Sequence, residues 1–597
     1  MTDATPDTHP QSAGPAAAAD GLARAILVLI FAAMALRAAW VCDDAYITLR
    51  TVDNFVHGLG LTWNPPDRVQ TFTHPLWLFL VTPFYALTRE AFFTTIFLGL
   101  AISIAAVSLL VLRFARSLAA ALAPMLALIL SQAFIDYSTA GMENPLTHLW
   151  LVLFLIVYFG REDGRAARFG MLALLAALAA LTRLDTLLLY VPPLAFAFVQ
   201  TVRRLSASGG PADAPPRGAR GLRSTRASAW LTACALLVAG FLPLVLWELF
   251  SIVYYGFPLP NTAYAKLSTG IPAGELLAQG GRYFLHTLRF DPVTLIAIAA
   301  GTALPWIRRE RRGLAVALGV VLYLLYVARI GGDFMAGRFF TTPLFASVAL
   351  LLVFSDTWLA AVRPGTEEDG RGAKSIGHLG NLKHDLLRLP RRALMAALAV
   401  IVLGLAPRLV PPAPEASPIR PSGIADERAY YAIEGRVLFK PRTLPKEPRI
   451  FGRERGEQLR GQGEGVVLEG AVGELGFYAG PGIKIVDLSG LADPLMARLP
   501  ALRFDPSAAL HRPQKSNWRI GHFLRAVPQG YLQTVMSDEN RLRDRRLGEF
   551  RERLRLITRG PLWSAERWSE IRRMNSGAWR DAFDAESYRN PARLTLA

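Results

Sequence analysis

Cysteine is almost absent from this chain, which has only Cys42 and Cys234 among 597 residues. In the membrane orientation derived below, the two lie at opposite faces and are too far apart to form a disulfide. The polar region after residue 411 has no cysteine, so no disulfide framework stabilises it. The histidines and cysteines also show no spacing that predicts a zinc site.

Acidic residues are scarce relative to basic ones. There are 47 Asp and Glu against 65 Lys and Arg, a formal net charge of +18. Such an excess can indicate a nucleic-acid partner. Here, however, the arginines cluster in short segments between apolar runs, as the positive-inside bias of membrane proteins produces. We therefore exclude nucleic acid as a partner. The clusters lie at 113–116, 161–168, 203–226, 308–312 and 388–392.

The hydrophobic residues, 52% of the chain, gather in runs of membrane-spanning length. Runs of roughly 16–25 residues cross ~30 Å of hydrocarbon as helices. They predict an α-helical polytopic membrane protein with about eleven transmembrane helices, placed at 22–41, 92–112, 118–135, 145–160, 167–182, 185–202, 229–250, 291–307, 313–329, 338–357 and 391–407. The first run lacks a small-residue cleavage site, so we expect a retained helix rather than a signal peptide.

With the N-terminus inside, every arginine cluster falls in the cytoplasm. We predict a disordered cytoplasmic N-terminus over 1–21 and a transmembrane catalytic domain over 22–407. The apolar stretch Leu76 to Leu87 is too short to span, so we expect it to be re-entrant or interfacial within a large outer loop, 42–91.

The polar residues 411–597 follow an odd number of predicted spans and therefore lie outside the membrane. Two strand-like runs bounded by glycine, at 465–469 and 483–487, predict a small extracytoplasmic α+β domain. Its tyrosines and tryptophans could bind an acceptor carbohydrate or could simply form its core.

The adjacent carboxylates Asp43 and Asp44 follow the first apolar run directly. Ionised groups at a membrane edge are costly and usually serve function. Two neighbouring like charges raise the pKa of at least one member, which suits a general base. The alternative is an ordinary N-cap for the helix-like stretch that follows.

The outer loops collect further polar and aromatic candidates, whereas the cytoplasmic loops hold little but Arg, Gly and Pro. Transfer of a sugar from a lipid phosphate needs a carboxylate base, cations for the leaving phosphate, and aromatic or amide surfaces for the sugar. The candidate substrate-binding residues are His74, Trp77, Glu143, Arg183, Asp185, Asn261, Tyr264, Lys266, Asp333 and Arg338.

Each charged candidate also has a structural alternative. Glu143 could cap a helix, and Arg183 with Asp185 could be an ion pair at the membrane edge. Lys266 could be an interfacial lysine whose stem lies in lipid. Asp333 and Arg338 could form a salt-bridged turn.

A divalent cation is a further expectation. Asp43, Asp44, Glu143 and Asp333 supply the oxygen ligands that Mg²⁺ and Ca²⁺ prefer, if they converge. The sequence itself does not show convergence.

Taken in order, the motifs of the outer loops resemble those of the integral-membrane GT-C glycosyltransferases. They are D-D-A-Y-I-T-L-R, R-V-Q-T-F-T-H-P-L-W, G-M-E-N-P-L, L-T-R-L-D, L-P-N-T-A-Y-A-K and G-G-D-F-M-A-G-R, with V-D-L-S-G-L-A-D-P in the C-terminal region. Within that superfamily the chain looks most like the terminal β-(1→2)-arabinofuranosyltransferases.

The resemblance implies a GT-C fold in the bacterial cytoplasmic (inner) membrane with an extracytoplasmic active site. It also implies transfer of arabinofuranose from decaprenyl-phosphoryl-arabinofuranose to a cell-envelope glycan. The family's catalytic carboxylate maps to Asp43, with Asp44 close behind. Donor and product are both β in that family, which implies retention, whereas most GT-C enzymes invert; the sequence leaves both outcomes open.

Two alternatives remain open at this point. The same fold could transfer another lipid-linked sugar, such as aminoarabinose to lipid A, or mannose or arabinose to a protein such as pilin. A flippase for lipid-linked sugars would instead need polar residues at mid-membrane and at both faces. Few are visible here, Arg37 and Glu248 among them.

Overall fold

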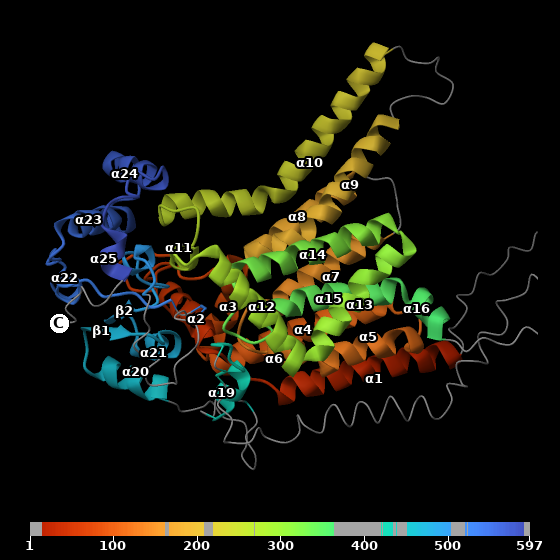
Figure 1. The fold of residues 1–597 in the computed structure, drawn as a ribbon, viewed down its shortest axis with the longest axis horizontal. Coiled ribbons are helices and arrows are strands. Elements are labelled where there is room, and N and C mark those ends of the chain that lie inside the picture. Colours follow the sequence, from red (N-terminus) through yellow and green to blue (C-terminus); the bar gives the residue numbers. More distant parts are fainter. Residues whose placement is uncertain are drawn as a thin grey trace, which may run out of the picture.

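The fold is a bundle of apolar helices with the C-terminal region seated on one end, as seen in a computed structural model (Figure 1). The structure describes residues 15–160, 166–207, 219–267, 269–362, 419–420, 422–433, 438, 451–502, 520–521 and 523–589. The predicted span 391–407 lies outside these residues.

The bundle is formed by helices from the first two thirds of the chain. They are α1 (Pro15–Arg37), α4 (Phe92–Phe114), α5 (Leu118–Leu130), α7 (Asn144–Phe159), α8 (Ala167–Thr182), α9 (Leu187–Ala207), α10 (Ala219–Tyr254), α13 (Pro292–Arg308), α14 (Arg311–Ile330), α15 (Thr341–Val353) and α16 (Ser355–Val362). Close approach relies on small residues. A Cβ at Gly301 of α13 would lie 2.2 Å from the Ser347 carbonyl oxygen of α15.

Five described helices are long and apolar enough to cross a membrane, those over Ala19–Arg37, Phe92–Phe114, Leu184–Ala207, Arg226–Tyr254 and Arg311–Ile330. The pair α12 (Ala273–Phe290) and α13 passes the same test together but is bent by 105°. Further predicted spans correspond to shorter apolar helices, Leu118–Leu130, Asn144–Phe159, Ala167–Thr182 and Arg338–Val353. Together these helices indicate a multi-pass membrane protein. The number of eleven transmembrane helices stays a prediction.

Two predictions near the N-terminus compare differently with the structure. The sequence predicts disorder over 1–21, whereas helix α1 already begins at Pro15, where a run of alanines favours helix. Leu76 to Leu87 matches α3 (Pro75–Thr88), a helix of 14 residues with Pro75 in its first turn. Its length agrees with a segment that does not cross the membrane by itself.

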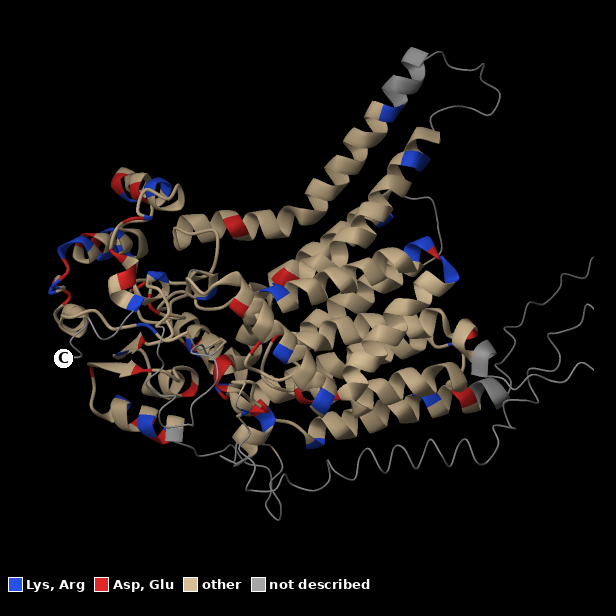
Figure 2. Ribbon diagram, in the orientation of Figure 1, with Lys and Arg blue, Asp and Glu red and all other residues tan. Residues whose placement is uncertain are grey.

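At the end of the bundle that carries the C-terminal region, short helices join the longer ones. They are α2 (Asp43–Val56), α6 (Gln132–Asp136), α11 (Asn261–Leu267) and α19 (Glu427–Ile433), with the 3₁₀ turns η1 (Leu184–Thr186) and η2 (Arg338–Phe340). Figure 2 shows few charged residues along the bundle, while Lys, Arg, Asp and Glu gather at its ends and in the C-terminal region.

The C-terminal region contains a parallel pair of strands, β1 (Gly465–Glu469) and β2 (Ile483–Asp487), with Gly465 opposite Ile483. Both strands lie where the sequence predicts them. Helix α21 (Gly473–Ala479) connects them. The other helices are α20 (Phe451–Gly461), α22 (Tyr531–Ser537), α23 (Arg545–Arg559), α24 (Ala565–Asn575) and α25 (Ala585–Arg589), with the 3₁₀ turn η4 (Met496–Arg498).

Buried arginines attach the C-terminal region to the bundle. Arg50 of α2 donates to the carbonyl oxygens of Gly476 and Ile483, at 2.7 and 2.8 Å, and lies 4.2 Å from the Trp63 ring centroid. Arg567 of α24 donates to the carbonyl oxygens of Val253 and Tyr254. Because buried donors left without acceptors are costly, these contacts fix the region against the bundle.

Candidate active site

The site begins at the first turn of α2, where Asp43 holds the start of α21. Its carboxylate oxygens accept hydrogen bonds from the backbone N–H groups of Gly473 and Glu474, both at 2.9 Å. Gly473 is required there, since a Cβ would lie 1.8 Å from the Asp43 carbonyl oxygen. Asp43 therefore caps a helix in the C-terminal region, 430 residues away in sequence.

Asp44 has different surroundings from its neighbour. It is half-buried, and in the described part of the chain no hydrogen bond reaches its carboxylate. Burial raises its pKa from the ordinary 3.8 to about 6; Lys266 and Arg338 oppose this shift, and Asp43 and Asp333 add to it. A carboxylate with this pKa, set among cations, can accept a proton near neutral pH.

Next to this pair lies a buried ionic network centred on Glu143, which is 1% exposed. Its Oε1 lies 3.0 Å from Arg338 Nη2 and 3.7 Å from Arg183 Nη1. Burial alone would raise the pKa of Glu143, but Arg338, His74 and Arg183 outweigh it and lower the pKa to about 2. Although Glu143 occupies the N-cap position of α7, its side chain makes no cap hydrogen bond.

His74 joins this network as a neutral ring. Its Nδ1 lies 3.4 Å from Glu143 Oε2, and its Nε2 lies 2.7 Å from the Thr48 hydroxyl. Burial lowers the pKa of His74 despite the nearby Glu143 carboxylate, so the ring is neutral at pH 7. A neutral imidazole can donate to Glu143 from one nitrogen and accept from Thr48 at the other.

Arg183 and Asp185 form the ion pair that was one of their two predicted roles. Two parallel hydrogen bonds of 2.9 Å join them, and the Tyr323 hydroxyl donates to Asp185 at 3.2 Å. The Arg183 guanidinium also lies 4.4 Å from the Phe339 ring centroid. Its Nη1 has no hydrogen-bond partner and faces Glu143.

The loop from Gly331 to Arg338 brings Asp333 and Arg338 into the site. Gly331, Gly332 and Gly337 all have positive φ, 93°, 73° and 74°, a conformation that favours glycine. Arg338 Nη1 lies 3.7 Å from Asp333 Oδ2, a weak ion pair beside the shorter contact to Glu143. Arg338 therefore connects both carboxylates rather than closing a simple salt-bridged turn.

The remaining predicted residues divide into two groups. Lys266 of α11 is exposed, and its charge acts on Asp44. Asn261 instead donates to the carbonyl oxygens of Gly490, Leu491 and Asp493, attaching α11 to the C-terminal region.

Tyr264 and Trp77 likewise make structural contacts. The ring of Tyr264 lies 4.6 Å from the Arg498 guanidinium. Trp77 is 1% exposed and donates to the Gly141 carbonyl oxygen. These two residues and Asn261 support the site, and none of the contacts places them at Asp44.

The expected cation site does not form among the described residues. They contain no group of three or more His, Cys, Asp or Glu side chains that could hold a metal ion. The donor set explains this, because Asp43 already accepts two backbone N–H groups and Glu143 is neutralised by arginines. These carboxylates do not fit a divalent ion, and both cysteines are free, as predicted.

Two residues near the site escaped the sequence-based prediction. Tyr137 and Glu427 are 2% and 7% exposed, and the charge of Glu427, with that of Asp333, acts on the Tyr137 hydroxyl. Glu427 comes from α19, where no local sequence pattern marks it as a site residue. For Tyr137 the available signal was its polar setting, with Asp136 before it and Ser138 and Thr139 after it.

The fold and its site are those of a multi-pass membrane protein with a charged centre at one end of its helical bundle. No protein-family model matches the chain. It is similar to the terminal β-(1→2)-arabinofuranosyltransferase of Corynebacterium glutamicum, with 30% identity over 54% of this chain and 51% of that protein. The enzyme of the same name from Mycobacterium tuberculosis is 26% identical over 66% of this chain and 62% of its own length.

These relatives confirm the resemblance drawn from the ordered motifs. The chain spans about half to three fifths of the length of the curated relatives it matches. A crystal structure of the Archaeoglobus fulgidus oligosaccharyltransferase in complex with Zn and sulfate aligns with 79% of this chain and 62% of its own, at 12% identity and a TM-score of 0.40.

Proposed function

We propose that this protein is a GT-C glycosyltransferase that transfers arabinofuranose from a polyprenyl-phosphate donor to a cell-envelope glycan. The reaction takes place on the outer face of the bacterial cytoplasmic membrane. The observation that carries the proposal is Asp44, a half-buried carboxylate under the charges of Lys266 and Arg338 at the charged end of an apolar bundle. The similarity to two arabinofuranosyltransferases supports the sugar.

The residues take separate roles in the transfer. Asp44 accepts the proton of the acceptor hydroxyl, whose oxygen forms the new bond to the anomeric carbon of the donor sugar. The bond between that carbon and the phosphate oxygen breaks, and the electron pair leaves with the polyprenyl phosphate. Lys266 binds the leaving phosphate as an exposed cation. Glu143 positions Arg338 at the side of Asp44.

The donor's lipid tail needs an apolar surface beside this centre. Helix α10, which Figure 1 shows bent and extending beyond the bundle, contains Pro243 and exposes Leu231, Val238 and Leu246. Apolar side chains exposed on a membrane helix face lipid chains. This surface supports a donor that remains in the bilayer while its phosphosugar reaches Asp44.

The pKa of Asp44 predicts how transfer depends on pH. A base must be ionised, and the pKa of about 6 leaves Asp44 protonated in more acidic solution. We expect kcat/KM to rise about tenfold per pH unit up to about pH 6 and to level off above about pH 7. Initial rates between pH 4.5 and 8.5 in nanodiscs measure this; a flat profile across pH 6 would argue against Asp44 as the base.

Replacing Lys266 tests the phosphate contact. Lys266→Met should raise the KM for the lipid donor about tenfold, the loss expected for one charge-assisted hydrogen bond, and leave the KM for the acceptor unchanged. Lys484→Met removes a lysine from β2 and serves as the matched control. An unchanged donor KM in Lys266→Met would remove this residue from the donor site.

The sugar is tested by offering the purified protein different lipid donors. We expect transfer from decaprenyl-phosphoryl-arabinofuranose and none from polyprenyl-phosphoryl mannose or aminoarabinose. Transfer from one of the latter would retain the fold and reaction class but replace the sugar. Movement of donor across liposomes without any transfer would instead indicate a flippase.

A further inference from the structure

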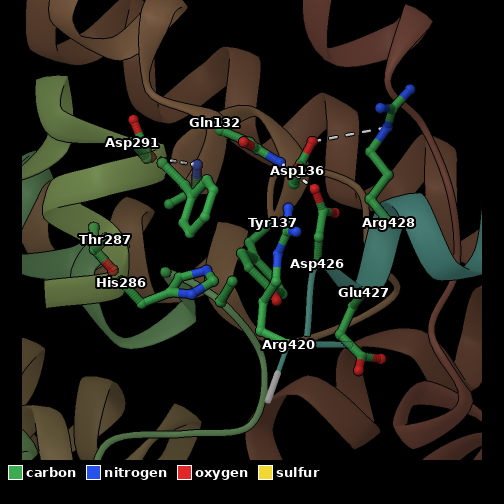
Figure 3. A pocket seen from close by; sticks show the side chains of 14 residues that line it. Gln132, Asp136, Tyr137, His286, Thr287, Asp291, Arg420, Asp426, Glu427 and Arg428 are labelled. Carbon is green, nitrogen blue, oxygen red and sulfur yellow. Dashed lines mark hydrogen bonds and ion pairs between the residues drawn. The ribbon is translucent and has the colours of Figure 1, made fainter. Parts of the chain in front are cut away.

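A polar cavity lies beside the loop that carries Asp333 and Arg338 (Figure 3). Its volume is about 240 Å³, the space of roughly eight water molecules. It is lined by α6, the end of α12, Ala336 and Gly337, and Arg420 with residues 426–428. It is therefore built from both the bundle and the C-terminal region, and none of the roles proposed above uses it.

Three polar side chains that line this cavity have no hydrogen-bond partner among the described residues: the Tyr137 hydroxyl, the His286 ring and the Arg420 guanidinium. Tyr137 is nevertheless 2% exposed. Figure 3 shows His286 and Arg420 extending from different elements toward the same space. His286 and Arg420 are half-buried, whereas the Tyr137 hydroxyl belongs to a buried side chain. Buried polar groups are nearly always satisfied, so this hydroxyl points to a ligand in the cavity.

The charges of the lining indicate what kind of ligand fits. Four acidic residues, Asp136, Asp291, Asp426 and Glu427, line the cavity against two arginines, Arg420 and Arg428, so the surroundings disfavour a phosphate or another anion.

Much of this charge is already paired. Gln132 donates to Asp426 at 2.8 Å, Arg428 Nε lies 3.7 Å from Asp136, and Asp291 accepts from Thr294 at 2.6 Å. The Tyr137 hydroxyl and the His286 ring, which can donate and accept, and the Arg420 guanidinium, which donates, make no hydrogen bond to the described residues, and such a set suits a neutral polyol.

The 333–338 loop connects the cavity to Asp44, because Ala336 and Gly337 line the cavity and the charges of Asp333 and Arg338 act on Asp44. Ala425 donates to the Phe334 carbonyl oxygen at 2.7 Å, and Ala336 donates back to the Ala425 carbonyl oxygen at 2.9 Å. This pairing fixes the 333–338 loop against the segment that contains Ala425. Gly337 packs closely on α6, since a Cβ at this position would lie 2.6 Å from the Ala133 Cβ.

We propose that this cavity is an acceptor subsite that binds one neutral sugar residue of the glycan, away from the residue whose hydroxyl reacts. The proposal rests on the glycosyltransferase function proposed above. Tyr137, His286 and Arg420 hydrogen-bond the hydroxyl groups of that sugar. The Phe290 ring packs against the last two, at 4.7 Å from the His286 ring centroid and 4.6 Å from the Arg420 guanidinium, and so holds them in place. The subsite thus favours an oligosaccharide over a single sugar as acceptor.

Acceptors of two lengths separate this subsite from the reacting centre. With methyl tetra-arabinofuranoside, Tyr137→Phe should raise the acceptor KM about fivefold and Arg420→Gln about tenfold, with kcat unchanged. With methyl arabinofuranoside, which is too short to reach the subsite, both variants should match the wild type. Tyr190→Phe, which removes another unpartnered buried hydroxyl on α9, is the control and should change neither.

Equal effects on both acceptors, or no effect on either, would overturn the subsite. Saturation-transfer NMR of the tetra-arabinofuranoside on nanodisc-embedded protein, without donor, provides a readout that needs no transfer. Binding by the wild type that weakens in Tyr137→Phe supports the subsite even if arabinofuranose is not transferred. Transfer by the wild type without any such difference rejects the subsite and leaves the proposed function intact.

Discussion

Asp44→Asn should lower kcat of arabinofuranose transfer by about 10²- to 10⁴-fold, the contribution typical of a general base. The amide has nearly the same shape but cannot accept a proton at neutral pH. Since Asp44 makes no hydrogen bond to the described residues, the folded state should keep its stability. Single-turnover rates and a thermal unfolding midpoint measure the two effects separately.

Asp43→Asn is the matched comparison, because it makes the same change one residue earlier. It leaves one side-chain acceptor for the α21 backbone in place of two. We expect a loss of about 1 kcal/mol in stability, as for a weakened cap, and at most about tenfold in kcat. A larger loss of activity in Asp43→Asn than in Asp44→Asn would return the base to Asp43, where the family resemblance places it.

Glu143→Gln should destabilise the protein by about 3–5 kcal/mol, since it leaves Arg338 and Arg183 buried without their shared counter-charge. The expected result is a lower unfolding midpoint in detergent together with reduced transfer. Glu457→Gln breaks a surface pair with Arg453 and should be nearly neutral. Equal midpoints for wild type and Glu143→Gln would contradict the role given to the network.

Hydropathy and charge predict the parts of this fold that depend on local composition. The helices over 92–112 and 313–329, the short segment at Leu76 to Leu87 and both strands of the C-terminal region lie where the sequence places them. The conformation of an apolar run of membrane length, or of a glycine-bounded strand, can be predicted from neighbouring residues alone. Helix α1 begins before the predicted span because Asp20 and Gly21 interrupt the apolar run, whereas the alanines that precede them still favour helix.

The site itself depends on contacts between distant residues. Glu143 meets Arg338 across 195 residues, and Asp43 meets Gly473 across 430. No local pattern distinguishes Asp43, which caps a distant helix, from Asp44, which faces the cations. The C-terminal region shows the same limit, because buried Arg50 and Arg567 fix it to the bundle although its sequence indicates a separate domain.

Native mass spectrometry of the protein with its lipid donor tests the central claim most directly. After incubation with decaprenyl-phosphoryl-arabinofuranose and acceptor, the wild type should carry decaprenyl phosphate, which is lighter than the donor by one pentose. Asp44→Asn should retain the intact donor. Loss of the pentose in both proteins would contradict the role of Asp44, and binding of no polyprenyl phosphosugar to either would contradict the proposed function.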